Sequence, residues 1–153
     1  MGDLAISIRP AREADLDAIN RIYNEEVLTG TATWDEAPWT AEQRADWFRS
    51  HDERTPVLVA ECDGAVAGFA YLSLASPKSG WRFSREDTIY IDEPFRGRGV
   101  GRQLLAALLA EAKRLGLNLI IASIASDNAA SLALHRNAGF EVVGTHREAG
   151  FKF

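Results

Sequence analysis

Three glycines and three arginines lie within the seven residues 96–102, directly before an apolar helical repeat. The first backbone amides of a helix have no partner inside the helix, and the helix dipole favours negative charge beside them. Glycine lets a ligand approach the backbone closely, and arginine adds long-range attraction for an anion. The spacing therefore predicts a cradle for a pyrophosphate group. The alternative is a glycine-rich turn whose arginines are only solvated.

Two known phosphate-binding motifs are excluded in this segment. The P-loop pattern G-x-x-x-x-G-K-[ST] is absent from the chain. The dinucleotide fingerprint G-x-G-x-x-G fails because Arg102 stands where the last glycine is needed. Neither an NTPase nor a nicotinamide-dependent dehydrogenase is indicated.

The composition limits the class of protein further. With 153 residues and 46% hydrophobic content, the chain suits a single domain over residues 1–153 with its own core. Its net charge of -5 argues against a nucleic-acid or anionic membrane surface as a partner. The single cysteine, Cys62, cannot form an internal disulfide, which favours the reducing cytoplasm. No apolar run reaches the ~18 residues of a membrane span, and we expect no metal site.

Hydrophobic periodicity and turn residues predict the elements that position this segment. The expected strands are 6–10, the two runs joined at Asp63–Gly64, 87–92, 117–125 and 141–147. The expected helices are 13–27, a helix opened by the capping box at Thr40–Gln43, 100–115, and a short helix within 127–139. Residues 117–125 are almost continuously apolar, which predicts a strand buried on both faces. This order indicates an α/β fold, a mixed sheet covered by helices.

At this point the sequence resembles a known family. "RGRGVG" matches the R/Q-x-x-G-x-G/A acyl-CoA signature of the GNAT N-acetyltransferases, and "DNAASLALHRNAGF" looks like their second cofactor segment. The resemblance implies a mostly antiparallel central sheet flanked by helices, with acetyl-CoA as cosubstrate. It implies that the pyrophosphate is held at Arg96, Gly97, Arg98, Gly99, Val100 and Gly101. It also implies that pantetheine contacts Asn128 and the backbone of Ile89, Tyr90 and Ile91. Asn128 also suits a helix cap, which is compatible with that contact.

Further segments narrow the resemblance to one branch. "GTATWDEAP", "FSREDTIYID", "LHRNAGF" and "AGFKF" look like the phosphinothricin/methionine sulfoximine acetyltransferases, over almost the whole chain. That branch acetylates amino acids and close analogues, so a small-molecule amine is the implied acceptor, and a homodimer the implied assembly. Its members continue beyond "GFKF" with a final strand. Because this chain stops at Phe153, we expect that strand to be missing or replaced by a different arrangement.

Acetyl transfer to an amine needs a base, because an ammonium has no lone pair with which to attack a thioester. Glu86, at the start of the strand "TIYI", matches the glutamate that is the base in the resembling branch, and Asp87 beside it is a competitor. No enzyme nucleophile is required, and the chain shows no convincing Ser/His/Asp or Cys/His arrangement. Many relatives have a tyrosine in the second cofactor segment that protonates the leaving thiolate. This chain has His135 near that position, so His135 is our candidate acid. A structural histidine is the alternative.

The acceptor site is expected between two loops. By resemblance, Trp34 borders the acceptor, with a core position as the alternative, and Asp87 and Thr88 lie beside the acceptor. An amino-acid carboxylate requires a cation, for which Lys78, Arg82 and Arg85 are available, with a surface charge as the alternative for each. Ser76 departs from the close relatives, which have an arginine there, so the carboxylate is expected to be bound differently. Two other readings stay open: acetylation of a protein or peptide amine, and a non-catalytic acyl-CoA-binding domain.

Overall fold

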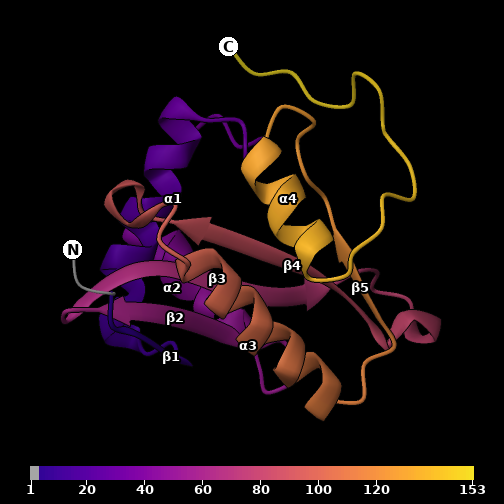
Figure 1. Cartoon of the computed structure of the whole chain (residues 1–153), viewed down its shortest axis with the longest axis horizontal. Coiled ribbons are helices and arrows are strands. Elements are labelled where there is room, and N and C mark those ends of the chain that lie inside the picture. The colour runs from indigo at the N-terminus through magenta and orange to yellow at the C-terminus, as the bar shows by residue number, and fades with distance from the viewer. Residues whose placement is uncertain (1–3) are drawn as a thin grey trace.

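In the computed structural model, the described residues, 4–153, form a five-stranded sheet with helices on both faces (Figure 1). The strands are β1 (Ile6–Pro10), β2 (Val57–Cys62), β3 (Ala65–Leu74), β4 (Ser84–Ile91) and β5 (Leu119–Ala122). They lie in the order β1-β2-β3-β4-β5, with β1 to β4 antiparallel and β5 parallel to β4. The predicted mixed α/β fold is confirmed.

The helices are α1 (Leu16–Thr29), α2 (Ala41–Ser50), α3 (Val100–Arg114) and α4 (Ala129–Asn137). Short 3-10 turns occupy Glu13–Asp15, Ser79–Trp81 and Glu93–Phe95. Helix α3 packs on one face of the sheet through its buried residues Val100, Leu104 and Leu108. Helices α1 and α2 cover the other face, where Ile19 and Ile22 of α1 pack near Phe69 of β3. Within residues 4–153, no helix has both the length and the hydropathy needed to cross a membrane.

Local sequence signals explain where several of these elements begin and end. Asp63 and Gly64 both have positive φ, 51° and 77°, as the tight turn between β2 and β3 requires. The Thr40–Gln43 capping box forms as predicted, because the Gln43 amide donates to Thr40 Oγ1 at 3.1 Å and the Thr40 amide donates to Gln43 Oε1 at 2.8 Å.

The pairing of β4 with β5 is short, and this opens the sheet. Strand β5 pairs with β4 only from Ser84 to Asp87. Beyond that point, residues 88–91 of β4 pair with β3 on one side and, among residues 4–153, with no strand on the other. The edge of β4 from Thr88 to Tyr90 is therefore available to a ligand, whereas the Ile91 carbonyl oxygen already accepts a hydrogen bond from Arg96 Nε.

Two expectations about the C-terminal third are wrong. The predicted strand 117–125 contracts to the four residues of β5, and it is half-exposed because it lies at the sheet edge with a partner on one side only. The predicted strand 141–147 is an exposed segment with no strand assigned, in which Val143 is 96% exposed. Without a neighbouring strand among the described residues, its backbone groups gain nothing from a strand conformation.

Candidate functional site

A cavity of about 270 Å³ lies where β4 and β5 diverge. Its walls come from β4, the β5–α4 connection, helix α4 and the loop after α1. Eight residues predicted from the sequence line it: Trp34, Glu86, Asp87, Thr88, Ile89, Tyr90, Asn128 and His135. The fold thus brings together residues that are as far apart as 34 and 135 in the chain.

Alternation along β4 divides these side chains between the two faces of the sheet. Tyr90 packs in the cluster formed with α1, whereas Ile89 and Ile91 pack in the cluster formed with α3. Glu86 has the parity of Tyr90, so its carboxylate lies on the α1 face, while Asp87 lies on the α3 face. The half-buried Glu86 side chain makes no hydrogen bond or ion pair within residues 4–153. Its carboxylate is therefore free to take a proton from an amine in the cavity.

Asp87 and His135 form a buried pair across the cavity wall. His135 Nε2 lies 2.8 Å from Asp87 Oδ2, and His135 Nδ1 lies 2.8 Å from the Ser131 carbonyl oxygen. A carbonyl only accepts, so Nδ1 donates, and Nε2–H donates to the carboxylate when the ring is protonated. Burial opposes that charge, but the hydrogen bond and negative charge of Asp87 outweigh it and raise the pKa of His135. Both ring nitrogens are thus engaged.

Asn128 occupies the N-cap of α4. Its Oδ1 accepts a hydrogen bond from the Ser131 amide at 3.1 Å. Its Nδ2 has no partner among the residues that the structure describes, and the side chain lines the cavity. One side chain can therefore cap the helix and donate to a ligand.

The glycine–arginine turn, residues 96–102, leads from β4 into α3. Gly99 is the N-cap of α3 with φ 85°, and Gly97 has φ 70°, so both adopt the left-handed conformation that glycine tolerates best. The space beside each is open, since an added Cβ would meet nothing within 4 Å. Arg98 and Arg102 are exposed. Unpaired helix amides, an open backbone and nearby cations fit the pyrophosphate of acetyl-CoA.

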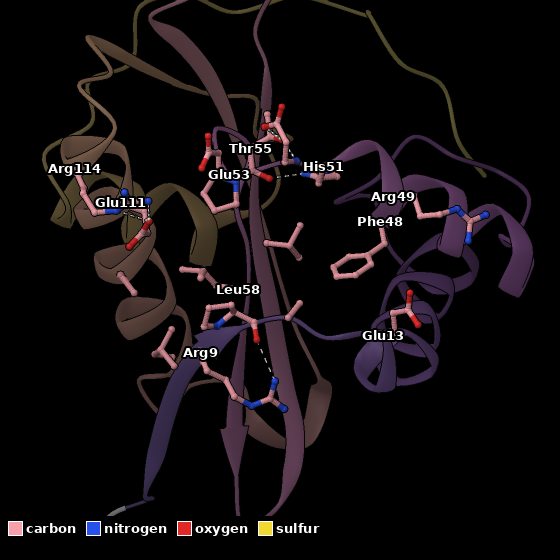
Figure 2. Close-up of a pocket in the computed structure, with 17 residues that line it drawn as sticks. Arg9, Glu13, Phe48, Arg49, His51, Glu53, Thr55, Leu58, Glu111 and Arg114 are labelled. Carbon is pink, nitrogen blue, oxygen red and sulfur yellow. Dashed lines mark hydrogen bonds and ion pairs between the residues drawn. The ribbon is translucent and has the colours of Figure 1, made fainter.

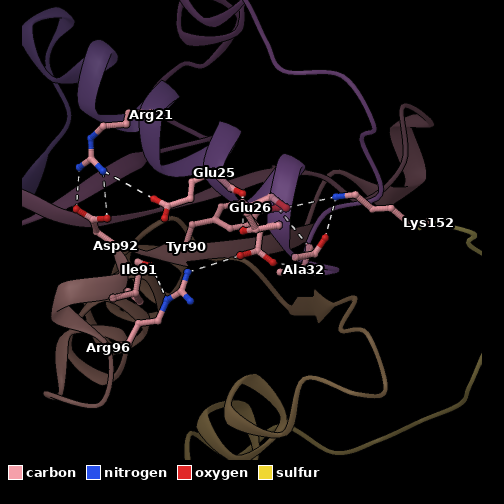
Figure 3. A network of polar contacts seen from close by, with 11 residues as sticks. Arg21, Glu25, Glu26, Ala32, Tyr90, Ile91, Asp92, Arg96 and Lys152 are labelled. Carbon is pink, nitrogen blue, oxygen red and sulfur yellow. Dashed lines mark hydrogen bonds and ion pairs between the residues drawn. The ribbon is translucent and has the colours of Figure 1, made fainter.

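Arg96 ties this turn to the rest of the site (Figure 3). Its Nε donates to the carbonyl oxygen of Ile91 at 3.0 Å, and its Nη2 lies 3.6 Å from Glu26 Oε2. Glu26 Oε1 in turn accepts from the amide of Ala32 at 3.0 Å. The glycine–arginine turn, the open edge of β4 and the loop carrying Trp34 are therefore connected by direct contacts.

None of the three predicted acceptor-binding cations lines the cavity, and Arg85 is buried and donates to backbone carbonyls. Lys78 and Arg82 are exposed, and neither is among the residues that line it. The Arg82 guanidinium instead donates to the Ser79 carbonyl at 3.3 Å and lies 4.7 Å from the centre of the Phe83 ring.

Tyr23 and Tyr71 also line the cavity, although no pattern in the sequence indicates a function for them. Tyr23 is part of a helical apolar repeat and Tyr71 lies in an apolar strand, so both patterns indicate only core residues. The Tyr23 hydroxyl contacts Thr33 Oγ1 at 2.9 Å and donates to Asp35. Burial and the hydrogen bond to Asp35 raise the pKa of Tyr23, so its hydroxyl stays a neutral donor.

A larger groove, about 750 Å³, lies between β1, the α2–β2 connection and α3 (Figure 2). None of the predicted site residues lines it. Its arginines already have acidic partners: Arg9 pairs with Asp15 at 2.7 Å, Arg114 with Glu111 at 2.8 Å, and Arg49 with Asp46. The positive charges around the groove are thus already paired with carboxylates, which leaves no free cation there, among residues 4–153, for the phosphates of a cosubstrate.

The opened sheet, the turn before α3 and the carboxylate beside the open edge are together the arrangement expected of an acyl-CoA-dependent transferase. Residues 19–140 match the acetyltransferase (GNAT) family model. The chain belongs to the GNAT acetyltransferase family, which confirms the family expected from the sequence.

Named relatives cover almost the whole chain. It is 41% identical over 152 residues to an L-methionine sulfoximine/L-methionine sulfone acetyltransferase of Pseudomonas paraeruginosa, covering 98% of this chain and 88% of that protein. It is 42% identical over 151 residues to a phosphinothricin N-acetyltransferase of Alcaligenes faecalis, covering 97% and 77%. The crystal structure of a GNAT superfamily phosphinothricin acetyltransferase from Sinorhizobium meliloti, in complex with acetyl-CoA, matches with a TM-score of 0.93 and 39% identity, covering 96% and 80%.

Proposed function

We propose that this protein transfers the acetyl group of acetyl-CoA to the primary amine of an amino acid or a close analogue. One observation carries the proposal: the Glu86 carboxylate and the open edge of β4 at Thr88–Tyr90 line the same cavity. The names of the relatives, which act on methionine sulfoximine, methionine sulfone and phosphinothricin, support the acceptor class.

Acetyl-CoA supplies an acetyl group activated as a thioester. The amides and arginines of residues 96–101 bind its pyrophosphate, and the backbone of Ile89, Tyr90 and Ile91 pairs with its pantetheine arm. The free amide nitrogen of Asn128 donates to the same arm. These contacts orient the thioester beside Glu86, and this ordering lowers the entropic part of the barrier.

Glu86 acts as the general base and takes a proton from the acceptor ammonium, directly or through one water. A backbone N–H of the open β4 edge stabilises the negative charge that develops on the acetyl oxygen. Trp34, Tyr23 and Tyr71 form apolar walls that limit the access of water to the reacting amine.

His135 is our candidate for protonating the departing thiolate, because it lines the cavity and holds a proton on Nδ1. Asp87 and Ser131 engage both ring nitrogens, so the transfer requires one of those hydrogen bonds to break. If the histidine is only structural, the thiolate leaves unaided, and His135→Gln lowers stability without lowering kcat.

The test is release of the coenzyme A thiol from acetyl-CoA across a panel of amino acids that includes methionine sulfoximine and phosphinothricin. We expect turnover on at least one acceptor and a loss of roughly 10²–10⁴-fold in kcat in Glu86→Gln. Glu141→Gln, which changes an exposed carboxylate outside the cavity, is the matched control. Tight acetyl-CoA binding with no turnover on any amino acid would contradict the acceptor class. Full activity of Glu86→Gln would contradict the assignment of the base.

We further propose a homodimer in the cytoplasm. Cys62 is buried and unpaired, which suits a reducing compartment. Large apolar side chains are exposed around the start of β4 and β5, namely Leu74, Trp81, Phe83 and Leu119, as expected of a contact surface. Light scattering after size exclusion would give twice the 16.8 kDa chain mass for the dimer and contradict it at the monomer mass.

A further inference from the structure

A buried arginine lies behind the wall that Tyr23 forms at the cavity. Arg44, in α2, is 2% exposed. Its Nε donates to Asn20 Oδ1 at 3.1 Å, while its Nη2 has no hydrogen-bond partner among residues 4–153. No carboxylate of the described residues forms an ion pair with it, in contrast to Arg9 and Arg21, which both have one. The charge of Asp35 nevertheless acts on it from the far side of Tyr23 and Trp39.

Aromatic rings surround the Arg44 guanidinium instead. Its central carbon lies 4.6 Å from the ring centre of Tyr23, 4.3 Å from that of Trp39 and 4.6 Å from that of Trp47. Such rings attract a cation but leave its net charge in place. Burial lowers the pKa of Arg44, but an arginine keeps its proton because its ordinary pKa lies so far above neutral pH. The core beneath the cavity therefore contains a fixed positive charge.

Only one layer of side chains separates this charge from the cavity. Tyr23, which contacts the guanidinium, lines the cavity. Trp47, which also contacts it, packs edge-on against Tyr71 with ring centres 5.0 Å apart, and Tyr71 lines the cavity too. A ligand in contact with the outer side of Tyr23 is thus roughly 8–9 Å from the charge.

If the acceptor carries a carboxylate, a positive charge is needed to offset the negative charges at the cavity surface. Glu86 and Asp87 are both acidic, and the imidazole of His135 is already paired with Asp87. Among the described residues, no lysine or arginine lines the cavity. An amino-acid carboxylate would therefore meet repulsion from Glu86 with no cation in contact to offset it.

We propose that Arg44 is a specificity-determining positioning residue, which favours acceptors bearing a carboxylate through the wall formed by Tyr23 and Tyr71. The inference rests on the proposed amino-acid acetyltransferase function and adds to it the source of the carboxylate preference. Arg44 does not touch the acceptor. It acts through the field of its charge in a poorly solvated region, where screening by water is weak.

The experiment compares each active amino acid with its decarboxylated amine, at fixed saturating acetyl-CoA, in the wild type and in Arg44→Met and Arg44→Lys. In the wild type we expect the KM of the amino acid to be at least about ten-fold below that of the amine. Arg44→Met is expected to raise the KM of the amino acid by roughly ten- to thirty-fold and to leave the KM of the amine and of acetyl-CoA within about two-fold. Arg44→Lys keeps the charge and is expected to retain most of the preference.

Arg85→Met is the matched control. Arg85 is also buried, at 4% exposure, but its guanidinium donates to the backbone carbonyls of Arg54, Arg82 and Ser84, and it does not line the cavity. Its loss is expected to lower stability without changing the ratio of the two KM values.

Equal increases in KM for the amino acid and the amine in Arg44→Met would overturn the inference while leaving the proposed function intact. If Arg44→Met does not fold, the wild type and Arg44→Lys still decide, because a wild-type enzyme that binds the amine as well as the amino acid contradicts the proposal. A wild type that acetylates amines and no amino acid would overturn the proposed function itself.

Discussion

His135 Nε2 lies 2.8 Å from Asp87 Oδ2, and this contact joins α4 to β4 next to the point where β5 turns away. The Asp87 carboxylate is buried, and its second oxygen has no partner among residues 4–153. The pair therefore fixes the distance between the strand that carries Glu86 and the helix that carries Asn128. The position of Glu86, proposed to activate the amine, relative to Asn128, proposed to bind acetyl-CoA, therefore depends on this contact.

The first prediction concerns the pH dependence of stability. The folded-state pKa of His135 is raised above its ordinary value of about 6.5, because Asp87 outweighs the effect of burial. A raised histidine pKa contributes stability that is fully present below about pH 6.5 and is lost as pH rises through the folded value. Urea unfolding of the wild type and His135→Gln should show a larger difference in the free energy of unfolding at about pH 6 than at about pH 9.

The control for this experiment is His146→Gln. His146 is exposed and lies in the segment after α4, so its loss should leave the free energy of unfolding almost unchanged at both pH values. A difference between the wild type and His135→Gln that is the same at both pH values would show that folding does not raise the pKa of His135.

A second prediction concerns the glycine–arginine turn. Gly99→Ala places a Cβ on a residue with φ 85°, which costs about 1–2 kcal/mol although the added carbon has space. The first turn of α3 must then shift, and we expect the Kd for coenzyme A to rise by roughly ten-fold. Gly80→Ala is the control, since its space is equally open without a positive φ. Isothermal titration with coenzyme A measures the effect, and equal affinities in both variants would contradict it.

Much of the site could be predicted because its signals are local. The turn at residues 96–102 requires glycine for its dihedral angles, and the cap of α4 requires a side chain such as Asn128. Strand parity also places Glu86 and Asp87 on opposite faces once the strand is recognised. These features depend on neighbours in the sequence and not on the rest of the fold.

The features that the sequence did not predict depend on tertiary contacts. Arg44 reads as a surface residue of an amphipathic helix, yet Tyr23, Trp39 and Trp47 enclose it in the fold. The segment 117–125 has the composition of a central strand, but its position at the sheet edge leaves it half-exposed. Nothing in a local window specifies which segments will be neighbours.

A third prediction concerns Lys152, which closes the end of α1. Its Nζ donates to the carbonyl oxygens of Glu26, Gly30 and Thr33 at 3.3, 2.8 and 3.2 Å (Figure 3). A cation is favourable at a helix C-terminus, where the last carbonyl groups have no partner inside the helix. Lys152→Met should lower the free energy of unfolding by about 1–2 kcal/mol. Lys113→Met, at an exposed lysine, should change it by less than about 0.5 kcal/mol, and thermal or urea unfolding compares the two.

The last prediction compares substitutions in the cavity wall with substitutions in the loop that precedes β4, by their effects on the acceptor KM. Trp34 lines the cavity, and its ring also packs against Gly150, where an added Cβ would lie 2.6 Å from the ring. Trp34→Ala removes apolar contact with the acceptor, so the acceptor KM should rise by roughly ten-fold, equivalent to about 1.4 kcal/mol. Lys78→Ala and Arg82→Ala remove exposed charges outside the cavity lining, and we expect the acceptor KM to change by less than about two-fold.

Steady-state kinetics with one acceptor at saturating acetyl-CoA distinguishes these cases. A large increase in KM for Lys78→Ala or Arg82→Ala would mean that the loop at residues 75–83 closes over the acceptor when it binds. The carboxylate would then have a cation in direct contact, and the need for a buried charge at Arg44 would disappear. The acceptor KM should therefore depend either on Lys78 and Arg82 or on Arg44, but not on both. Either a cation in direct contact or a buried charge behind the wall is sufficient to offset the repulsion from Glu86.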